Sequence, residues 1–316
     1  MYKYPKKFPF RLAATSFIYP DKIIPNVMKL GSFFDEIELL LFESKPFIVK
    51  DNINGSKIVE VLPSKEEIKE LGELSKKFDL TYNIHLPVDI SLTDSSKSVR
   101  LESIETVKKV VALCEPLNPT TYTLHLDFNI NGDNPQNNLA IPISPTPAPS
   151  PMERGINTPS LPLGRAGEGQ NNYLESYINL EIWREYVKDS LQLLSSSLSD
   201  PSIISIETLD YPFEYIGDIV ESCKMSVCID AGHLIKYGYS IEKLFAKYKA
   251  IVPIIHLHGV EFPSLKDHQP LGKTPSHILE PTMNVLKNFK GVVSLELFNY
   301  EHLSKSLEFL NQRYNY

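Results

Sequence analysis

The sequence predicts an α/β protein with the (βα)8 TIM-barrel architecture, and three observations lead to this prediction. Eight short apolar runs follow one another along the 316 residues, which is typical of strands buried on both faces. A segment with helical spacing of apolar residues follows each run, and eight βα units in a row close naturally into a barrel. No GxGxxG motif follows the first run, which disfavours a doubly wound dinucleotide-binding sheet.

Most of the eight expected strands end in an acidic residue or a histidine. In chain order the strands are LAATSF (12–17), IELLLFE (37–43), TYNIHLP (81–87), TYTLHLD (121–127), IISIETLD (203–210), SVCIDAGH (226–233), VPIIHLHG (252–259) and VVSLELF (292–298). The active site of a TIM barrel lies at the carboxyl ends of its strands. We therefore expect these polar endings to meet in one shared site.

The expected helices are recognised by apolar residues three or four positions apart. The first ends at Gly31, and the second opens at Ser64 with Glu67 three residues later, a capping-box pattern. In chain order the helical segments are DKIIPNVMKLG (21–31), IKELGELSKKF (68–78), VRLESIETVKKVVALC (99–114), EIWREYVKDSLQLLSSSL (181–198), PFEYIGDIVESCK (212–224), SIEKLFAKYKA (240–250), PSHILEPTMNVLKNF (275–289) and EHLSKSLEFLNQRY (301–314).

One segment interrupts this rhythm between the fourth strand and its helix. It spans about 129–172, is rich in Pro, Gly and Ser, and has no apolar period. Because such a composition is typical of disorder, we expect one TIM-barrel domain over 1–316 with a disordered insert. The insert is either a lid or partner-binding tail, or a tolerated insertion without catalytic consequence, and we favour the second interpretation.

The bulk composition indicates a soluble enzyme that acts on small molecules. The formal net charge is −7 and the pI is about 5.7, which argues against a protein whose affinity comes from neutralising phosphates. The three cysteines have no CxxC spacing and indicate a reducing compartment. We see no signal peptide and no transmembrane stretch, so we expect a cytoplasmic protein with no nucleic-acid or membrane partner.

The strand endings predict a metal site. Glu207, Asp230 and Glu296 would meet at one barrel mouth, where three carboxylates repel one another unless some are protonated or a cation neutralises them. Histidine ligands favour a divalent transition metal, zinc or manganese, over magnesium or calcium. The histidines expected here are His85, His125, His233 and His256.

Several of these residues have a structural alternative. His85 taken alone is more often a satisfied barrel residue, and Asp230 alone could cap a helix. His256 and His258 point the same way, and the deeper His256 is the expected ligand, with His258 contacting substrate or supporting a ligand. Two further assignments stay open: Asp267 and His268 as a second metal site, and Glu43 as a catalytic base or an anchor.

The segments IHLP, LHLD, IETLD, DAGH, IHLHG and SLELF resemble the xylose-isomerase-like TIM-barrel superfamily, over the whole chain apart from the insert. The resemblance implies metal ligands that differ between branches. The isomerase branch would use Glu207, Asp230, His256 and Glu296. The endonuclease IV branch would use these four residues together with His85, His125, His233 and His268. That branch carries an Asp-x-His motif after the seventh strand, whereas here Asp267 and His268 are adjacent, so the match is imperfect.

A narrower resemblance, carried by DYPFE after the fifth strand and HLHG in the seventh, is to the cobamide-remodelling phosphodiesterases. It implies a metal-dependent hydrolase that cleaves the nucleotide loop of adenosylcobamides at the phosphoribosyl linkage. The products would be cobinamide phosphate and the lower-ligand riboside, and the small-molecule substrate a corrinoid. Within it, Glu207 would position a metal hydroxide, His258 would stabilise the leaving oxygen, and Glu43 would assist catalysis.

Other functions stay open beside this one. A sugar isomerase or epimerase of the same superfamily would need a divalent metal and a proton-transfer base, but no hydrolytic water. A metal-dependent nuclease is disfavoured by the acidic net charge. A non-catalytic barrel that only binds a corrinoid or a sugar has no need for three carboxylates at one point.

Overall fold

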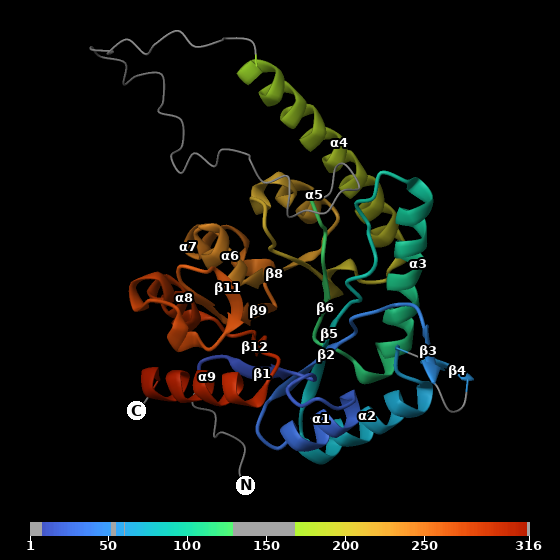
Figure 1. Ribbon diagram of the computed structural model, residues 1–316, viewed down its shortest axis with the longest axis vertical. Coiled ribbons are helices and arrows are strands. Elements are labelled where there is room, and N and C mark those ends of the chain that lie inside the picture. Colours follow the sequence, from blue (N-terminus) through green and yellow to red (C-terminus); the bar gives the residue numbers. More distant parts are fainter. Residues whose placement is uncertain (1–7, 52–54, 60, 129–167, 315–316) are drawn as a thin grey trace.

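The computed structural model describes residues 8–51, 55–59, 61–128 and 168–314 of the chain. Eight parallel strands close into a barrel in the order β1-β12-β9-β8-β7-β6-β5-β2, which confirms the predicted TIM barrel (Figure 1). These strands are β1 (Arg11–Thr15), β2 (Glu36–Leu40), β5 (Thr81–His85), β6 (Tyr122–Leu124), β7 (Ile204–Glu207), β8 (Ser226–Asp230), β9 (Ile254–Leu257) and β12 (Val292–Leu295).

Helices cover the outside of the barrel (Figure 1). They are α1 (Ile23–Leu30), α2 (Lys65–Phe78), α3 (Lys97–Cys114), α4 (Glu168–Ser197), α5 (Gly217–Ser222), α6 (Ala231–Tyr237), α7 (Ile241–Tyr248), α8 (Ser276–Asn288) and α9 (Tyr300–Arg313). The predicted capping box of α2 is present. The Ser64 hydroxyl accepts from the Glu67 N–H at 3.2 Å, and the Glu67 carboxylate accepts from the Ser64 N–H at 2.8 Å.

The structure adds elements that the sequence analysis did not predict. Two hairpins stand outside the barrel, β3 (Phe47–Asp51) with β4 (Gly55–Val59), and β10 (Gly259–Glu261) with β11 (Lys266–Gln269). A short helix, α6, begins directly after β8. The helix expected at 212–224 is instead a 3-10 turn at Phe213–Tyr215 followed by α5.

The predicted insert falls almost wholly outside the described residues, which end at 128 and resume at 168. Its last residues, 168–172, belong to α4 and are therefore helical. Within the described ranges, no helix combines the length and the apolar composition that crossing a bilayer requires.

Polar side chains line the inside of the barrel, whereas the main apolar core lies between the strands and the helices. Near the amino ends of the strands, Glu36 lies 3.1 Å from the Arg11 guanidinium and accepts from the Asn83 amide at 2.9 Å. Two residues further along β2, Glu38 has no exposed surface. Because alternate residues of a strand face the same side, this polar column continues toward the carboxyl ends and the site there.

Candidate metal centre

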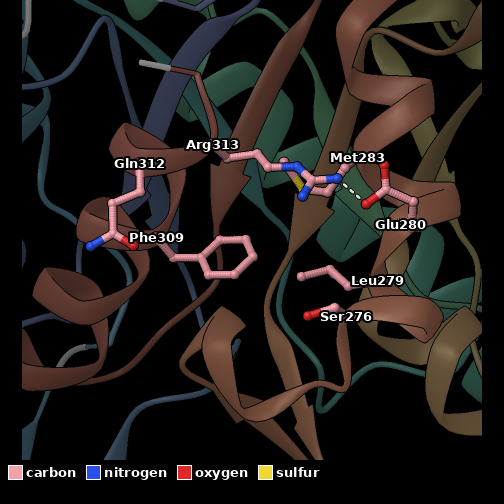
Figure 2. A pocket seen from close by; sticks show the side chains of 7 residues that line it. All are labelled: Ser276, Leu279, Glu280, Met283, Phe309, Gln312 and Arg313. Carbon is pink, nitrogen blue, oxygen red and sulfur yellow. Dashed lines mark hydrogen bonds and ion pairs between the residues drawn. The ribbon is translucent and has the colours of Figure 1, made fainter.

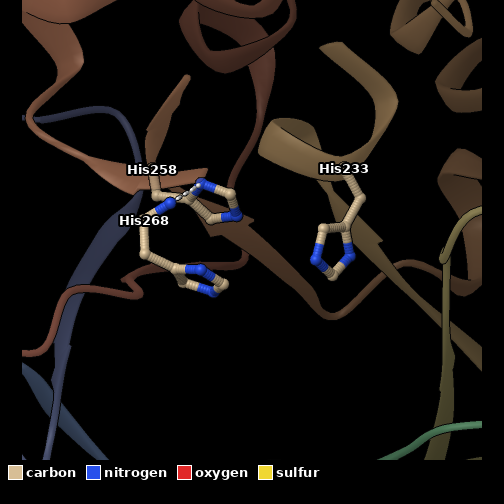
Figure 3. A group of neighbouring side chains, drawn as sticks. All are labelled: His233, His258 and His268. Atoms are coloured by element: carbon tan, nitrogen blue, oxygen red, sulfur yellow. Dashed lines mark hydrogen bonds between the residues drawn. The ribbon is translucent and has the colours of Figure 1, made fainter. Parts of the chain in front are cut away.

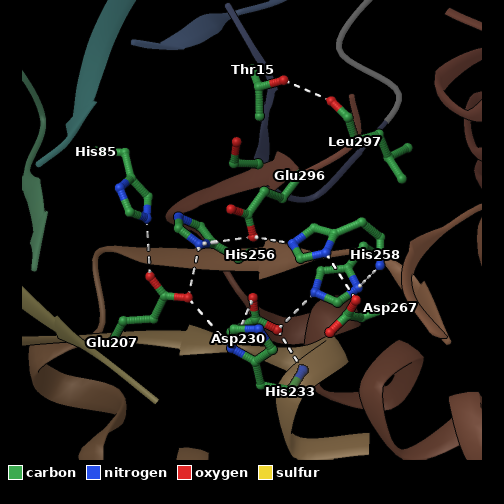
Figure 4. Close-up of polar contacts among 12 residues, drawn as sticks. Thr15, His85, Glu207, Asp230, His233, His256, His258, Asp267, Glu296 and Leu297 are labelled. Atoms are coloured by element: carbon green, nitrogen blue, oxygen red, sulfur yellow. Dashed lines mark hydrogen bonds and ion pairs between the residues drawn. The ribbon is translucent and has the colours of Figure 1, made fainter. Parts of the chain in front are cut away.

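Four neighbouring strands bring three carboxylates and one imidazole to a single point at the barrel mouth. Glu207 ends β7, Asp230 ends β8, His256 lies in β9, and Glu296 follows β12 (Figure 4). One ligand atom from each of these four buried residues lies within 4.8 Å of the others. The Nδ1 atom of His256 is 3.6 Å from Oε1 of Glu207 and 3.5 Å from Oε2 of Glu296. These four residues are called the central group below.

Buried atoms of the central group lack hydrogen-bond partners among the described residues. Three of them converge, namely Oδ2 of Asp230, Nδ1 of His256 and Oε2 of Glu296, whereas the fourth, Nε2 of His256, faces Glu38. A buried polar atom without a partner is destabilising, and such atoms are rare in native proteins. Since all three belong to one cluster, a divalent cation bound among them would satisfy them together. The donor set fits a transition metal, because it mixes imidazole nitrogen with carboxylate oxygen.

The second group adjoins the central group through Glu207. His85, His125 and Glu207 each offer a ligand atom within 4.8 Å of the others. The Nδ1–H of His85 donates to the Leu86 carbonyl at 2.9 Å, which leaves its Nε2, 3.4 Å from Glu207, available to a metal. The Nε2 atom of His125 lies 2.9 Å from the same carboxylate oxygen. Glu207 thus connects the two groups.

A third group gathers three imidazoles on the opposite side, contributed by His233, His258 and His268 (Figure 3). The Nδ1–H of His233 donates to the Thr208 carbonyl at 3.2 Å, so its Nε2 is available to a metal. The Nδ1 atom of His258 accepts the backbone N–H of His268 at 3.0 Å. Its Nε2 lies 3.2 Å from Oδ1 of Asp230, so His258 links the third group to the central group.

Two residues of the DAGH segment, Asp230 and Gly232, are constrained by contacts with the histidines of the third group. Asp230 caps α6, because its Oδ1 accepts the backbone N–H of His233 at 2.7 Å, which leaves Oδ2 for the central group. The two predicted alternatives for Asp230, helix cap and ligand, therefore use different oxygens. At Gly232, an added Cβ would lie 2.0 Å from the His258 ring. Only glycine lets this ring pack under the first turn of α6.

The carboxylates raise the pKa of the histidines around them. Burial lowers the pKa of His85, but the carboxylates of Glu207, Glu38 and Glu296 together outweigh burial and raise it to about 9. Burial likewise lowers the pKa of His268, and Asp267 with Glu296 raises it to about 10. Without a bound cation, protons on these imidazoles balance the carboxylates. A metal would displace those protons, since it needs neutral imidazole.

The histidines in turn lower the pKa of the carboxylates. Burial raises the pKa of Glu207, but His125 and His256 outweigh it and hold the pKa well below its usual range. The pKa of Glu296 is lowered in the same way, against burial, chiefly by His256. Both groups are therefore ionised at neutral pH.

All eight residues expected to ligate metal lie in these three adjoining groups. They are His85, His125, Glu207, Asp230, His233, His256, His268 and Glu296. Two other expected site residues are not members of these groups. Asp267 lies beside the third group, with its Oδ1 3.3 Å from Nδ1 of His268, and forms an ion pair with Lys236 at 2.6 Å. Glu43 is exposed and lines a cavity beside the mouth, so it does not belong to any of the three groups.

Sequence analysis missed Glu38. Its Oε1 lies 2.9 Å from Nε2 of His256, on the side of the ring that faces away from the central group. Ser294 donates to its other oxygen at 2.5 Å. The signal was present, because Glu36 and Glu38 alternate with apolar residues in β2 and so share the inward face.

A cavity of about 240 Å³ between α8 and α9 is not part of this site (Figure 2). Its lining offers one ion pair, between Arg313 and Glu280, and no histidine or paired carboxylates.

No protein-family model and no curated protein matches this sequence. Solved structures do. A D-tagatose 3-epimerase-like protein matches with a TM-score of 0.63 and 16% identity, over 96% of this chain and 97% of that one. The 3-keto-D-glucoside 4-epimerase YcjR from E. coli matches with a TM-score of 0.60 and 13% identity, over 96% and 99%. An IOLI protein with a bound zinc atom matches with a TM-score of 0.58 and 16% identity, over 96% and 97%. At these identities the likeness establishes the xylose-isomerase-like TIM-barrel fold.

The prediction of a hydrolase is wrong. The similar structures with a stated activity include the 3-keto-D-glucoside 4-epimerase, a D-allulose 3-epimerase from Methylomonas sp. and an L-ribulose 3-epimerase, none of which is a hydrolase. The cobamide-remodelling family and a corrinoid substrate find no support among them. The physical reason is that the motifs behind the prediction form barrel strands and a cluster of histidines and carboxylates, and neither feature determines the reaction type.

Proposed function

We propose that the protein is a divalent-metal-dependent epimerase or isomerase of a sugar or sugar derivative that carries a carbonyl group. The observation that carries this proposal is the central group, in which two ionised carboxylates, Glu207 and Glu296, flank one potential metal position. The fold likeness to sugar epimerases supports the same reaction class. A proton transfer between the two faces of a carbon requires one acid–base group on each face, and two carboxylates can fill these roles.

The residues that would hold the metal are Glu207, Asp230, His256 and Glu296, whose unpartnered atoms converge. Bound there, a zinc or manganese ion would polarise the substrate carbonyl and so acidify the adjacent C–H. Asp230 is held for this role by its helix cap, and His256 by Glu38 behind it. Fixed ligand orientation of this kind lowers the reorganisation that binding requires.

The proton transfer belongs to Glu207 and Glu296. One carboxylate, in its ionised form, removes the proton from the carbon beside the carbonyl. The other takes up a proton from solvent when the substrate binds and returns it to the opposite face of that carbon. The product is then the epimer. If the proton is returned instead to the neighbouring carbon, the product is the aldose or ketose isomer. Both routes leave the substrate mass unchanged and need no hydrolytic water.

The two flanking groups complete the site. We propose that His85 and His125, and on the other side His233 and His268, bind substrate oxygens or a further cation beside the central group. His258 has no exposed surface and lies against Asp230, so we assign it a positioning role beneath that ligand.

Solvent exchange tests this function directly. Protein stripped with a chelator and reloaded with zinc or manganese is incubated in D2O with a panel of ketoses, aldoses and 3-keto-glycosides. We expect one class to gain deuterium at the carbon beside the carbonyl and to yield an isomer, and we expect the stripped protein to be inactive. A metal-loaded protein that binds a panel sugar without exchanging its proton would establish the non-catalytic barrel instead.

A further inference from the structure

We propose that the barrel mouth holds, beside the metal centre, a subsite for an apolar ring, so that the substrate is a sugar bearing an aromatic or alicyclic substituent and not a free sugar. This inference rests on the proposed function for the sugar end of the substrate. The subsite is the cavity lined by Ser16, Phe17, Ile24, Phe42, Glu43 and Leu62.

Large apolar side chains are exposed at this part of the mouth. Phe17 follows β1, Phe42 follows β2 and Phe298 follows β12, and these side chains are 43%, 41% and 37% exposed. Phenylalanines are usually buried, and several exposed ones near a polar site indicate a binding surface. The three belong to neighbouring barrel strands, so they gather on one side of the mouth.

Hydrogen bonds between the strand ends fix the backbone that carries these aromatic residues. The Thr15 hydroxyl donates to the Leu297 carbonyl at 2.8 Å, and the Ser16 hydroxyl accepts the Leu40 N–H at 3.1 Å. The ends of β1, β2 and β12 are thereby joined. The rings of Phe17 and Phe42 meet edge to face with centroids 5.1 Å apart. This geometry leaves an aromatic face for a ligand ring without a large ordering cost.

The cavity is large enough and has the right lining. Its volume is about 520 Å³, which lies within the range of roughly 300–1,000 Å³ typical of small-molecule pockets. Phe17, Ile24, Phe42 and Leu62 supply apolar surface, and Glu43 stands among them. Glu43 is therefore placed to contact a hydroxyl of the substituent or its linkage.

Phe298, which follows the strand beside β1, connects the aromatic side of the mouth to the metal centre. The ring of Phe298 lies 4.7 Å from the ring of His268, which belongs to the third imidazole group. The opposite side of the mouth is polar and carries His125, which follows β6 and lies against Glu207. A substrate with a polar sugar end and an apolar ring would match both halves. A protein partner seated on the aromatic side would instead obstruct substrate entry to the central group.

The test compares matched glycosides. Methyl and phenyl glycosides of the same 3-keto sugars are titrated by calorimetry into the zinc-loaded protein. Burial of one phenyl ring predicts that the phenyl member binds roughly tenfold tighter or more. We expect Phe42→Ala and Phe17→Ala to abolish this preference, and Leu101→Ala, at an equally exposed leucine on α3, to keep it. Equal affinities in every pair, or a preference unchanged in Phe42→Ala, would overturn the subsite.

A second measurement separates this inference from the proposed function. The ring alone, supplied as 4-fluorophenol, is followed by fluorine NMR with metal-free protein, in which no sugar chemistry takes place. Line broadening that disappears in Phe42→Ala but persists in Leu101→Ala supports the subsite, even if solvent exchange finds no epimerase. Broadening that is equal in both variants overturns it. A change of oligomeric state in Phe42→Ala without a change in ring binding would also overturn it, and would assign the surface to contacts between copies.

Discussion

The Nε2 atom of His256 lies 2.9 Å from Oε1 of Glu38, and neither side chain has exposed surface. The other ring nitrogen of His256 faces the carboxylates of Glu207 and Glu296. A carboxylate behind a ligating histidine fixes the orientation of its ring and raises its basicity. Glu38 thus connects the polar interior of the barrel to the proposed metal position.

Glu38→Gln is expected to weaken metal binding about 10–100-fold, because the amide keeps the shape of the carboxylate but loses its charge. Competition with a chromophoric chelator measures this affinity without any substrate. Glu242→Gln, at an exposed position on α7, is the matched control. Unchanged zinc affinity in Glu38→Gln would refute the positioning role of Glu38.

Gly232→Ala is expected to displace His258 and to destabilise the folded protein by about 1–3 kcal/mol, because the added Cβ would lie 2.0 Å from the ring. Gly72→Ala in α2 is the control, since its Cβ would meet its nearest neighbour at 4.0 Å. That substitution should be neutral or stabilising by up to about 1 kcal/mol, as alanine favours helix more than glycine does. Urea unfolding of the two variants checks both values. Equal stabilities would contradict the packing of His258 under α6.

The sequence predicted that these polar residues come together, because they end apolar strands. Glu207 and Asp230 close β7 and β8, and parallel strands of a barrel share one carboxyl end. Glu38 escaped prediction because it lies inside an apolar run, where the alternation shows that the side chain faces inward but not which residue it contacts. That partner, His256, is more than two hundred positions away in the sequence.

Local elements were missed for other physical reasons. Helix α6 has seven residues, too few to show an apolar period. It begins directly after its N-cap Asp230, which the sequence analysis assigned either to the metal or to a cap, but not to both. The hairpin of β10 and β11 carries His268 in a left-handed conformation with φ of 51°, which only a few per cent of non-glycine residues adopt. The reaction type was misjudged because hydrolysis and proton transfer use the same kinds of ligand.

The stability of the metal-free protein is expected to fall as pH rises. The folded-state pKa of His85 is about 9 and that of His268 about 10, both above the ordinary value of 6.5. Their contribution is therefore complete below about pH 6.5 and is lost as pH rises through 9 and 10. Metal affinity should increase over the same range, because protons compete with the metal.

Urea midpoints measured with chelator from pH 6 to 10 check this expectation. His85→Gln should flatten part of the decline, whereas His277→Gln, at an exposed position of α8, should leave it unchanged. Stability that is constant or rises between pH 6.5 and 10 would contradict the proposed balance of imidazolium and carboxylate.

Glu207→Gln and Glu296→Gln are expected to affect opposite faces of the substrate. Each variant should lower net turnover about 10²–10⁴-fold, the usual contribution of a general acid or base. The carboxylate that remains still faces one side of the reacting carbon, so each variant should exchange deuterium into only one of the two epimers. The two variants should differ in which epimer that is. Mass spectrometry of each epimer in D2O, with the metal content measured in parallel, reads this out, and Glu70→Gln on the outside of α2 serves as the control. If both metal-loaded variants exchange neither epimer, or exchange the same one, the two carboxylates do not divide the proton transfer between them.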